Sequence, residues 1–202
     1  MPRRPILILA AIVLLIAAGL GGYVLLAGPD HRPSSSGVAL VGGPFAMVDQ
    51  DGRRVTEKDF LGKYMLVFFG YTYCPDVCPT ELQVMTAALD QMGPEAARIQ
   101  PVFVSIDPER DTPAVLKAYV GNFGPRLIGL TGTAEEVAAI AKSYRVYYAK
   151  AANSGSGTDY LMDHSSIIYL MGPDGRFVTH MAYTTDATKL AAELKETLST
   201  SP

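Results

Sequence analysis

The 202-residue chain is poor in cysteine and has no cluster of basic residues. It contains two cysteines and three histidines, and its formal net charge is −3. Because no run of lysine or arginine is present, the sequence does not indicate a nucleic-acid partner. No segment recurs at a period of about 20 to 50 residues, so a repeat protein is not indicated. Hydrophobic residues make up 49% of the chain, enough for an ordinary core that needs no disulfide bond.

The N-terminal region carries a long uncharged run. Arg3 and Arg4 precede an apolar stretch from Pro5 to Gly28, which is long enough for a helix to cross a bilayer core of about 30 Å. The positive-inside rule then places the N-terminus in the cytoplasm and the remainder outside. We therefore expect residues 1–28 to be a membrane anchor, with a cleaved signal peptide as the alternative. No Arg- and Ser-rich transit peptide is visible, which favours a single-pass protein of a bacterial inner membrane with its soluble domain in the periplasm.

Two further regions are predicted after this anchor. Residues 29–43 are mostly small and polar, with a bias to glycine, proline and serine, which is typical of a flexible tether. Residues 44–202 have the mixed apolar and polar pattern of a soluble domain.

Periodicity predicts an ordered series of strands and helices in this domain. Asp51-Gly52 is typical of a hairpin turn, and the apolar run 64–71 of a buried central strand. Thr133 and Glu136 form a capping box at the start of a helix. The full series is a hairpin at 45–57, a strand at 64–71, a helix from about 79 to 92, a strand at 102–106, a helix after 111, a strand at 126–130, a helix from 133 to about 144, two extended segments in 145–163 joined by a Gly/Ser-rich tip, a hairpin at 165–181 and a helix from about 186 to 198.

This order indicates an α/β fold. The early strand–helix–strand units predict parallel strands, and the late hairpin adds antiparallel strands. With a cysteine pair directly after the first core strand, the pattern is similar to the thioredoxin fold, with an N-terminal β-hairpin and an inserted βα unit. Function has to be argued from the site, because a fold alone does not determine it.

The segment "GYTYCPDVCPTEL" holds both cysteines, Cys74 and Cys78. A redox pair, a metal site and a structural disulfide are the alternatives for two thiols at this spacing. A disulfide closing so short a loop would stabilise the domain by only about 2 kcal/mol in the chain-entropy model, so a purely structural role is disfavoured. Prolines after both cysteines argue against a regular helix through the turn, and we expect the helix to start near Pro79. A nearby helix N-terminus would favour thiolates.

The predicted topology brings a histidine to these cysteines. In a thioredoxin-like sheet, the strand that follows His164 runs antiparallel to the first core strand, so it starts at the edge where that strand ends. His164 is therefore expected close to Cys74 and Cys78. Two thiolates and an imidazole make a coherent site for soft metals such as Cu(I) or Zn. His31 falls in the tether and His180 lies one strand further out, so neither is a favoured ligand.

Several neighbouring residues have alternative interpretations. Asp111 is the predicted N-cap of a helix that has a proline in its first turn. Asp107 ends a strand at the active edge, where it forms a turn or cap, or else tunes the site or contacts a partner. Asp76 is expected to be exposed between the cysteines, capping the turn or contacting a partner. Tyr71 and Tyr73 are expected to shield the thiols while leaving one face open.

Three motifs carry a resemblance to a known family. "GYTYCPDVCPTEL", "VSIDPERDTP" and "DYLMDHSSIIYLMGPDG" occur in this order behind the N-terminal apolar run. Over about residues 44–198, the chain closely resembles the Sco/SenC family. The resemblance implies a thioredoxin-like fold and copper binding through Cys74, Cys78 and His164, with Cu(I) as the expected form and Cu(II) as an open alternative.

The resemblance also implies a metallochaperone rather than an enzyme. Its implied partner is subunit II of cytochrome c oxidase, in which it helps to build the dinuclear copper centre. Other periplasmic copper carriers and thiol reductants are further candidate partners.

A thiol-disulfide reductase is the alternative function. Cys74 and Cys78 would form its redox-active disulfide, acting on the cysteines of the same oxidase subunit or of other exported proteins. Thioredoxin-type reductants have one residue fewer between their cysteines, and peroxiredoxins have threonine where this chain has Tyr71. We therefore expect copper delivery by stepwise ligand exchange to be the principal function.

Overall fold

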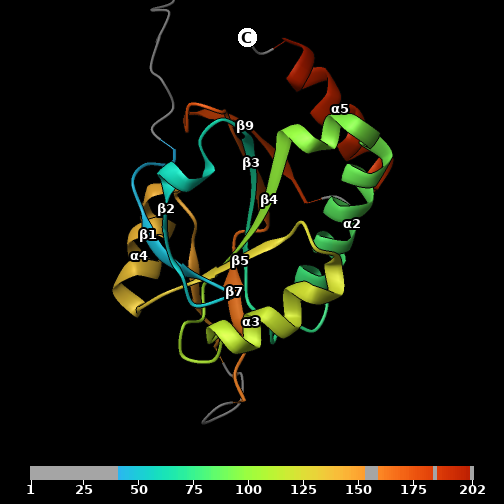
Figure 1. Cartoon of the computed structure of the whole chain (residues 1–202). Coiled ribbons are helices and arrows are strands. Elements are labelled where there is room, and N and C mark those ends of the chain that lie inside the picture. Colours follow the sequence, from blue (N-terminus) through green and yellow to red (C-terminus); the bar gives the residue numbers. More distant parts are fainter. Residues whose placement is uncertain (1–40, 153–158, 184–185, 201–202) are drawn as a thin grey trace, which may run out of the picture. The chain divides into compact units, whose positions relative to one another are not determined.

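A mixed β-sheet with helices on both faces forms the described part of the chain (Figure 1). The computed structural model describes residues 41–152, 159–183 and 186–200, all within Ala39–Pro202, the second of the chain's two units. The predicted membrane anchor, residues 1–28, and most of the predicted tether, 29–43, lie outside the described residues. Within the described ranges, no helix combines the length and the apolar character needed to cross a membrane.

The described strands form one large sheet and one small ribbon. The strands are β1 (Ala46–Asp49), β2 (Arg54–Thr56), β3 (Tyr64–Gly70), β4 (Ile99–Ser105), β5 (Ile128–Thr131), β6 (Tyr148–Lys150), β7 (Met162–His164), β8 (Ile167–Met171) and β9 (Phe177–Ala182). The main sheet has the order β2-β1-β5-β4-β3-β8-β9, and β6 and β7 pair separately. β3, β4 and β5 are parallel, and the other pairs are antiparallel.

Helices cover both faces of the main sheet. They are α2 (Val77–Met92), α3 (Pro113–Val120), α4 (Ala134–Ser143) and α5 (Ala187–Thr200), with short 3-10 segments at Glu57–Phe60, Gly93–Arg98 and Gly121–Phe123. The crossovers β3–α2–β4 and β4–α3–β5 step in the same direction, so right-handed connections place α2 and α3 on one face. α5 packs against α2 on that face, and α4 lies on the other (Figure 1). This arrangement agrees with the predicted α/β class and is consistent with a thioredoxin-like fold.

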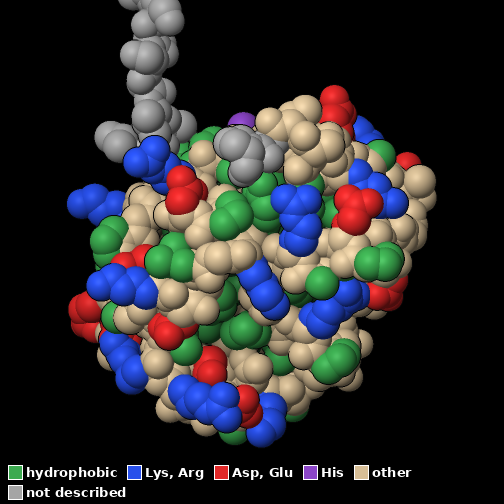
Figure 2. Space-filling view, turned by 45° about the horizontal axis from the view of Figure 1, so that its top comes forward, with side chains coloured by type: hydrophobic (Ala, Val, Ile, Leu, Met, Phe, Trp, Pro, Cys, Tyr) green, Lys and Arg blue, Asp and Glu red, His purple; other side chains and the backbone are tan. Residues whose placement is uncertain are grey.

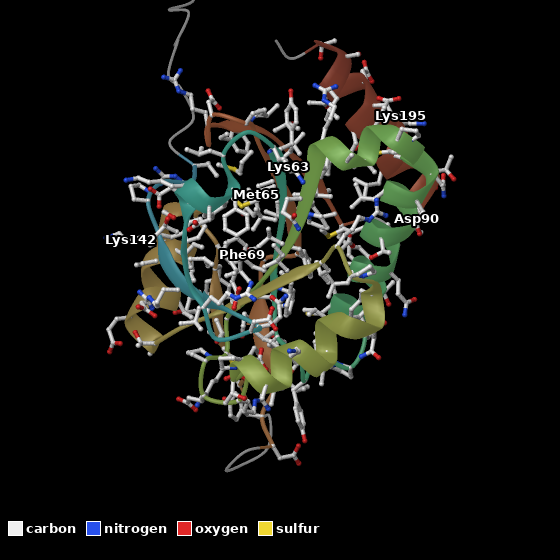
Figure 3. The ribbon with its side chains drawn as sticks, in the orientation of Figure 1. Lys63, Met65, Phe69, Asp90, Lys142 and Lys195 are labelled. Atoms are coloured by element: carbon white, nitrogen blue, oxygen red, sulfur yellow. The ribbon has the colours of Figure 1, made fainter. Side chains whose placement is uncertain are left out.

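β3 is the buried centre of the sheet, as the apolar run 64–71 predicted. All of its residues are buried, because it lies between β4 and β8 with helices over both faces. Phe68 stacks on Phe103 of the parallel neighbour. Met65 and Phe69 point to the opposite face, toward α4, where the Phe69 ring lies 5.2 Å from that of Tyr144 (Figure 3).

The edge at which β3 ends is where the site is built. Gly70 pairs with Ser105 at the end of β4, so these two carboxyl ends lie together. β8 runs antiparallel to β3, with Phe68 opposite Ile168, and therefore begins at the same edge. This confirms the topology from which the proximity of the histidine was predicted. His164 itself belongs to the ribbon strand β7 and not to the main sheet.

The helix after the cysteines begins earlier than predicted. α2 starts at Val77, so Cys78 lies in its first turn and Pro79 follows it there. The first turn tolerates proline because its N–H groups have no partner within the helix, which is why the expected start near Pro79 was too late. Leu82 and Met85 lie on the buried face as predicted, and the helix ends at Met92 with Gly93 as its C-cap.

The predicted N-cap of the next helix is wrong by one residue. Thr112 is the N-cap of α3, and its side chain accepts a hydrogen bond from the backbone N–H of Val115. Asp111 is instead fully buried, with its carboxylate turned to other partners. The two adjacent residues are both good caps, and the buried partners of Asp111 decide between them.

Other local predictions are confirmed. Gly52 has a φ of 81° in the turn between β1 and β2, a conformation that favours glycine. Thr133 and Glu136 form the capping box of α4. β8 and β9 form the late hairpin, and the tip predicted between the ribbon strands falls largely outside the described residues.

The surface shows no separation of charge on the face drawn in Figure 2. Lysine and arginine side chains alternate there with aspartate and glutamate. Exposed ion pairs of the described residues include Lys117 with Asp51 and Arg126 with Asp90. Exposed pairs of this kind contribute little to stability.

We expect Leu194→Ala to lower the free energy of unfolding by about 2–5 kcal/mol. Leu194 is fully buried on α5, which packs against α2, so its truncation leaves a cavity. The matched control Glu196→Ala changes an exposed position of the same helix and should stay within about 0.5 kcal/mol. Chemical denaturation of both variants measures the difference, and equal effects would contradict the packing of α5.

Candidate metal centre

The two cysteines approach each other because a loop and a helix meet at the end of β3. Cys74 lies in the loop and is partly exposed, whereas Cys78 is fully buried in the first turn of α2. The backbone N–H of Cys78 donates to the Cys74 sulfur at 3.4 Å. Gly70 makes room for this arrangement, since a Cβ there would lie 2.7 Å from the Cys78 sulfur.

His164 reaches the sulfurs from the ribbon. Its Nε2 lies 3.4 Å from the Cys78 sulfur, and its Nδ1 lies 3.2 Å from the backbone carbonyl oxygen of Ser165. A carbonyl can only accept, so Nδ1 carries the donated proton and Nε2 is the nitrogen that faces the sulfurs. The rings of Phe68 and Tyr71 meet the imidazole edge-on at 6.1 and 6.0 Å between centroids, which fixes its orientation.

The three side chains have the geometry of a metal site. One ligand atom from each of Cys74, Cys78 and His164 lies within 4.8 Å of the others. Within the described ranges, these residues are the one group of at least three His, Cys, Asp or Glu side chains with this property. Two soft sulfurs and an imidazole suit Cu(I) or Zn²⁺, so the donor set fits copper.

The environment distinguishes the two thiols. The hydrogen bond from the Cys78 thiol lowers the pKa of Cys74 to about 3, and the His164 imidazole lowers it further against the opposing effect of burial. For Cys78 the same hydrogen bond, followed by burial, raises the pKa well above its usual range. Without metal, the shared hydrogen bond favours the thiolate at the more exposed Cys74 and the protonated thiol at the buried Cys78, and a metal bound by both sulfurs must displace the remaining proton.

The tyrosines flanking the cysteine loop lie in different environments. Tyr71 is buried against the imidazole, as expected for a shielding residue, and burial raises its pKa. Tyr73 is 59% exposed, and its ring faces the guanidinium of Arg110 at 4.7 Å. The thiols therefore remain accessible on the side of Cys74.

Asp111 holds the cysteine loop instead of capping a helix. Its carboxylate accepts hydrogen bonds from the backbone N–H of Thr72 at 3.1 Å, from the Thr72 hydroxyl at 2.6 Å and from the Ser105 hydroxyl at 2.6 Å. Burial raises the pKa of Asp111, while these donors oppose that effect. The end of β4 is thereby fastened to the residues just before Cys74.

The side chains of the remaining predicted residues are not part of the cluster, although the backbone N–H of Asp76 donates a hydrogen bond to the Cys74 sulfur. Asp107 is buried and accepts hydrogen bonds from Arg110 and from the hydroxyl of Tyr160. Asp76 is exposed at the N-cap position of α2 without a side-chain capping bond. His180 is exposed on β9, where it stacks on Phe177, outside the cluster.

Arg110 and Tyr160 were not singled out from the sequence, although both touch the segments that build the site. Arg110 belongs to the motif "VSIDPERDTP", but nothing in that motif shows that its arginine contacts a residue fifty positions later. Tyr160 carried no signal beyond its place before the "DH" pair.

The comparisons with known proteins point to one family. The family model described as SCO1/SenC matches residues 33–199. The chain is 50% identical over 145 residues to Protein SCO1 homolog 1, mitochondrial, of Arabidopsis thaliana, covering 71% of this chain and 43% of that protein. It is 41% identical over 195 residues to the human Protein SCO1 homolog, mitochondrial, covering 90% and 64%. The chain thus spans less than two thirds of the length of either relative.

Solved structures of related proteins share the fold. Arabidopsis thaliana ScoI with copper bound has a TM-score of 0.75 and 43% identity, covering 80% of this chain and 99% of that one. Bradyrhizobium japonicum ScoI with copper bound has a TM-score of 0.71 and 47% identity, covering 77% and 98%. Both of these relatives were solved with copper.

We expect limited alkylation of the reduced chain to modify Cys74 before Cys78. Cys74 is partly exposed and is the thiolate of the pair, and the thiolate is the nucleophile, whereas Cys78 is buried and protonated. Peptide mass spectrometry after treatment with less than one equivalent of iodoacetamide identifies the labelled residue. Equal labelling, or a preference for Cys78, would contradict this assignment.

Proposed function

Because the chain belongs to the SCO1/SenC family, we propose that it binds one copper ion through Cys74, Cys78 and His164 and delivers it to subunit II of cytochrome c oxidase. The observation that carries the proposal is the convergence of two sulfurs and an imidazole nitrogen within 4.8 Å. Relatives of similar fold were solved with copper bound, which supports the choice of metal. The acceptor is the dinuclear copper centre of the oxidase, which is what the resemblance to the family implies.

Transfer proceeds by exchange of ligands one at a time, so that the ion is never released to solvent. Cys74 and His164 are partly exposed, and Cys78 is fully buried. An incoming thiol or imidazole can therefore replace Cys74 or His164 first, and Cys78 last. Three ligands leave a coordination position open for this exchange, unlike the closed four-ligand cage of a structural zinc site.

A thiol-disulfide reductase remains the second candidate function. It is favoured by the unequal thiols, since a thiolate at Cys74 can attack a target disulfide and form a mixed disulfide. The buried Cys78 then attacks the Cys74 sulfur, which closes an internal disulfide and releases the target as a dithiol. Both electrons come from this chain, which must be reduced again by a thiol donor.

We also propose that residues 1–28 anchor the chain in a bacterial inner membrane, with residues 29–43 as a tether and residues 44–202 in the periplasm. The uncharged run from Pro5 to Gly28 supports the anchor, and the arginines before it support the orientation. Delivery to a membrane-bound oxidase is easier for a tethered carrier, because both partners then diffuse in one plane.

We expect the reduced full-length chain to bind one Cu(I) with high affinity and His164→Ala to bind it more weakly. Cys74→Ser and Cys78→Ser should abolish tight binding, because a hydroxyl is a poor ligand for a soft ion. His164→Ala should still form and exchange the Cys74–Cys78 disulfide, since that chemistry needs no imidazole ligand. Competition with a Cu(I) chelator measures affinity, and thiol titration measures disulfide exchange.

The matched control is His180→Ala, which removes an exposed histidine outside the cluster. It should bind Cu(I) as the unaltered chain does. Unchanged affinity in either cysteine variant would reject the metal site. In cells whose only copy is His164→Ala, full oxidase activity in copper-poor medium would favour the reductase instead.

The intact chain should sediment with membranes and resist release by carbonate. An apolar helix in the bilayer is held by hydrophobic burial and not by charge, so high pH does not extract it. Immunoblotting of membrane and soluble fractions provides the measurement. A mature protein that begins near Gly28 in the soluble fraction would show that the run is a cleaved signal peptide.

A further inference from the structure

We propose that Arg110 is a positioning residue that holds the ribbon of His164 against the cysteine loop, an inference that rests on the proposed metal site. Arg110 lies in the loop between β4 and α3 and is not within the group of ligand atoms. Its side chain is 10% exposed, so its contacts are made in a largely buried environment. It acts on copper binding through the placement of His164.

On the ribbon side, Arg110 contacts Tyr160, which precedes β7 by two residues. Its Nη1 donates to the backbone carbonyl of Tyr160 at 2.8 Å. Its guanidinium carbon also lies 3.7 Å from the centre of the Tyr160 ring, the closest of its aromatic contacts. β7 begins at Met162 and ends at His164, so the contacted residue, Tyr160, is four positions before the imidazole in the sequence.

On the other side, Arg110 contacts its own loop and the cysteine loop. Its Nε donates to the carboxylate of Asp107, which is 2% exposed and also accepts from the Tyr160 hydroxyl at 2.6 Å. The guanidinium lies 4.7 Å from the ring of Tyr73 and 5.7 Å from that of Tyr71. One planar cation therefore joins the strand end at β4, the approach to Cys74 and the start of β7.

The ribbon needs such an attachment because it is not part of the main sheet. β6 and β7 pair only with each other, and a two-stranded ribbon by itself is marginally stable in water. Met162 packs partly against the core, and His164 pairs with Tyr148 of β6, but neither strand pairs with the main sheet that carries the cysteines. The pair of Lys150 with Glu109 is exposed and holds the ribbon only weakly.

The shape of the guanidinium explains why arginine suits this position. Its planar fork donates in two directions and stacks on aromatic faces at the same time. A lysine ammonium could keep the charge near Asp107, but it could not also reach the Tyr160 carbonyl in the same geometry. Arg110→Lys should therefore fold normally and still lose part of the positioning effect.

The test is a double-mutant cycle on the reduced full-length chain. Arg110→Gln and Arg110→Lys are made alone and in the His164→Ala background, with Arg126→Gln as a control that removes a surface arginine and its ion pair elsewhere. We expect the Kd for Cu(I) to rise about tenfold or more in Arg110→Gln and less in Arg110→Lys, as for residues that orient a metal ligand. In the His164→Ala background neither change should weaken binding further, because Arg110 acts through His164.

Spectroscopy and redox chemistry give readouts that general destabilisation would not move. With Cu(II) added, nitrogen hyperfine coupling in the electron paramagnetic resonance spectrum should weaken in Arg110→Gln, because the imidazole is displaced. The rate of Cys74–Cys78 disulfide exchange should equal that of the unaltered chain. Arg126→Gln should show neither change.

The outcomes separate the two proposals. If His164→Ala weakens binding but Arg110→Gln does not, the positioning role is rejected and the metal site stands. A further loss in the double variant, with slowed disulfide exchange, would show that Arg110 supports the whole domain, and would also reject the role. Unchanged affinity in His164→Ala would reject the metal site itself.

Discussion

The buried carboxylate of Asp111 is the constraint on which the arrangement of the cysteines depends. A carboxylate in an apolar interior is destabilised unless donors compensate it, and Thr72 and Ser105 supply three hydrogen bonds between them. These bonds can form only when the loop after β3 lies against the end of β4. Because Thr72 comes two residues before Cys74, holding Thr72 in place also restricts where the Cys74 sulfur can lie.

The loop between β4 and α3, which carries Asp111, also contacts the ribbon of His164 through the preceding residue, Arg110. Asp111 turns toward the cysteine loop, whereas Arg110 turns toward Tyr160 and the ribbon. The cysteines are placed by the main sheet, since β3 leads straight into their loop, but His164 stands on strands that the sheet does not hold. Side-chain contacts must therefore supply what strand pairing supplies elsewhere, which explains why a buried cation lies between the two parts.

Sequence reasoning reached the site through topology and missed what fastens it. His164 could be placed near the cysteines because an antiparallel neighbour must begin where β3 ends. The ribbon was foreseen only as extended segments, since strands as short as β6 and β7 carry almost no periodic pattern. The N-cap of α3 was predicted at Asp111 and not at Thr112 for a similar reason. Local sequence preference carries no information about a buried partner such as Ser105.

The attachment of the three ligands also bears on how the proposed transfer can run. Cys78 is part of α2 and lies on its buried face with Leu82 and Met85, so moving its sulfur would disturb the packed first turn of the helix. Cys74 lies in a loop, and His164 lies on a two-stranded ribbon outside the main sheet. Ligands that are less integrated in the fold can move at a smaller cost in free energy, because fewer packed contacts are broken. The order of exposure and the order of structural integration thus agree, and both make Cys78 the last ligand to give up the ion.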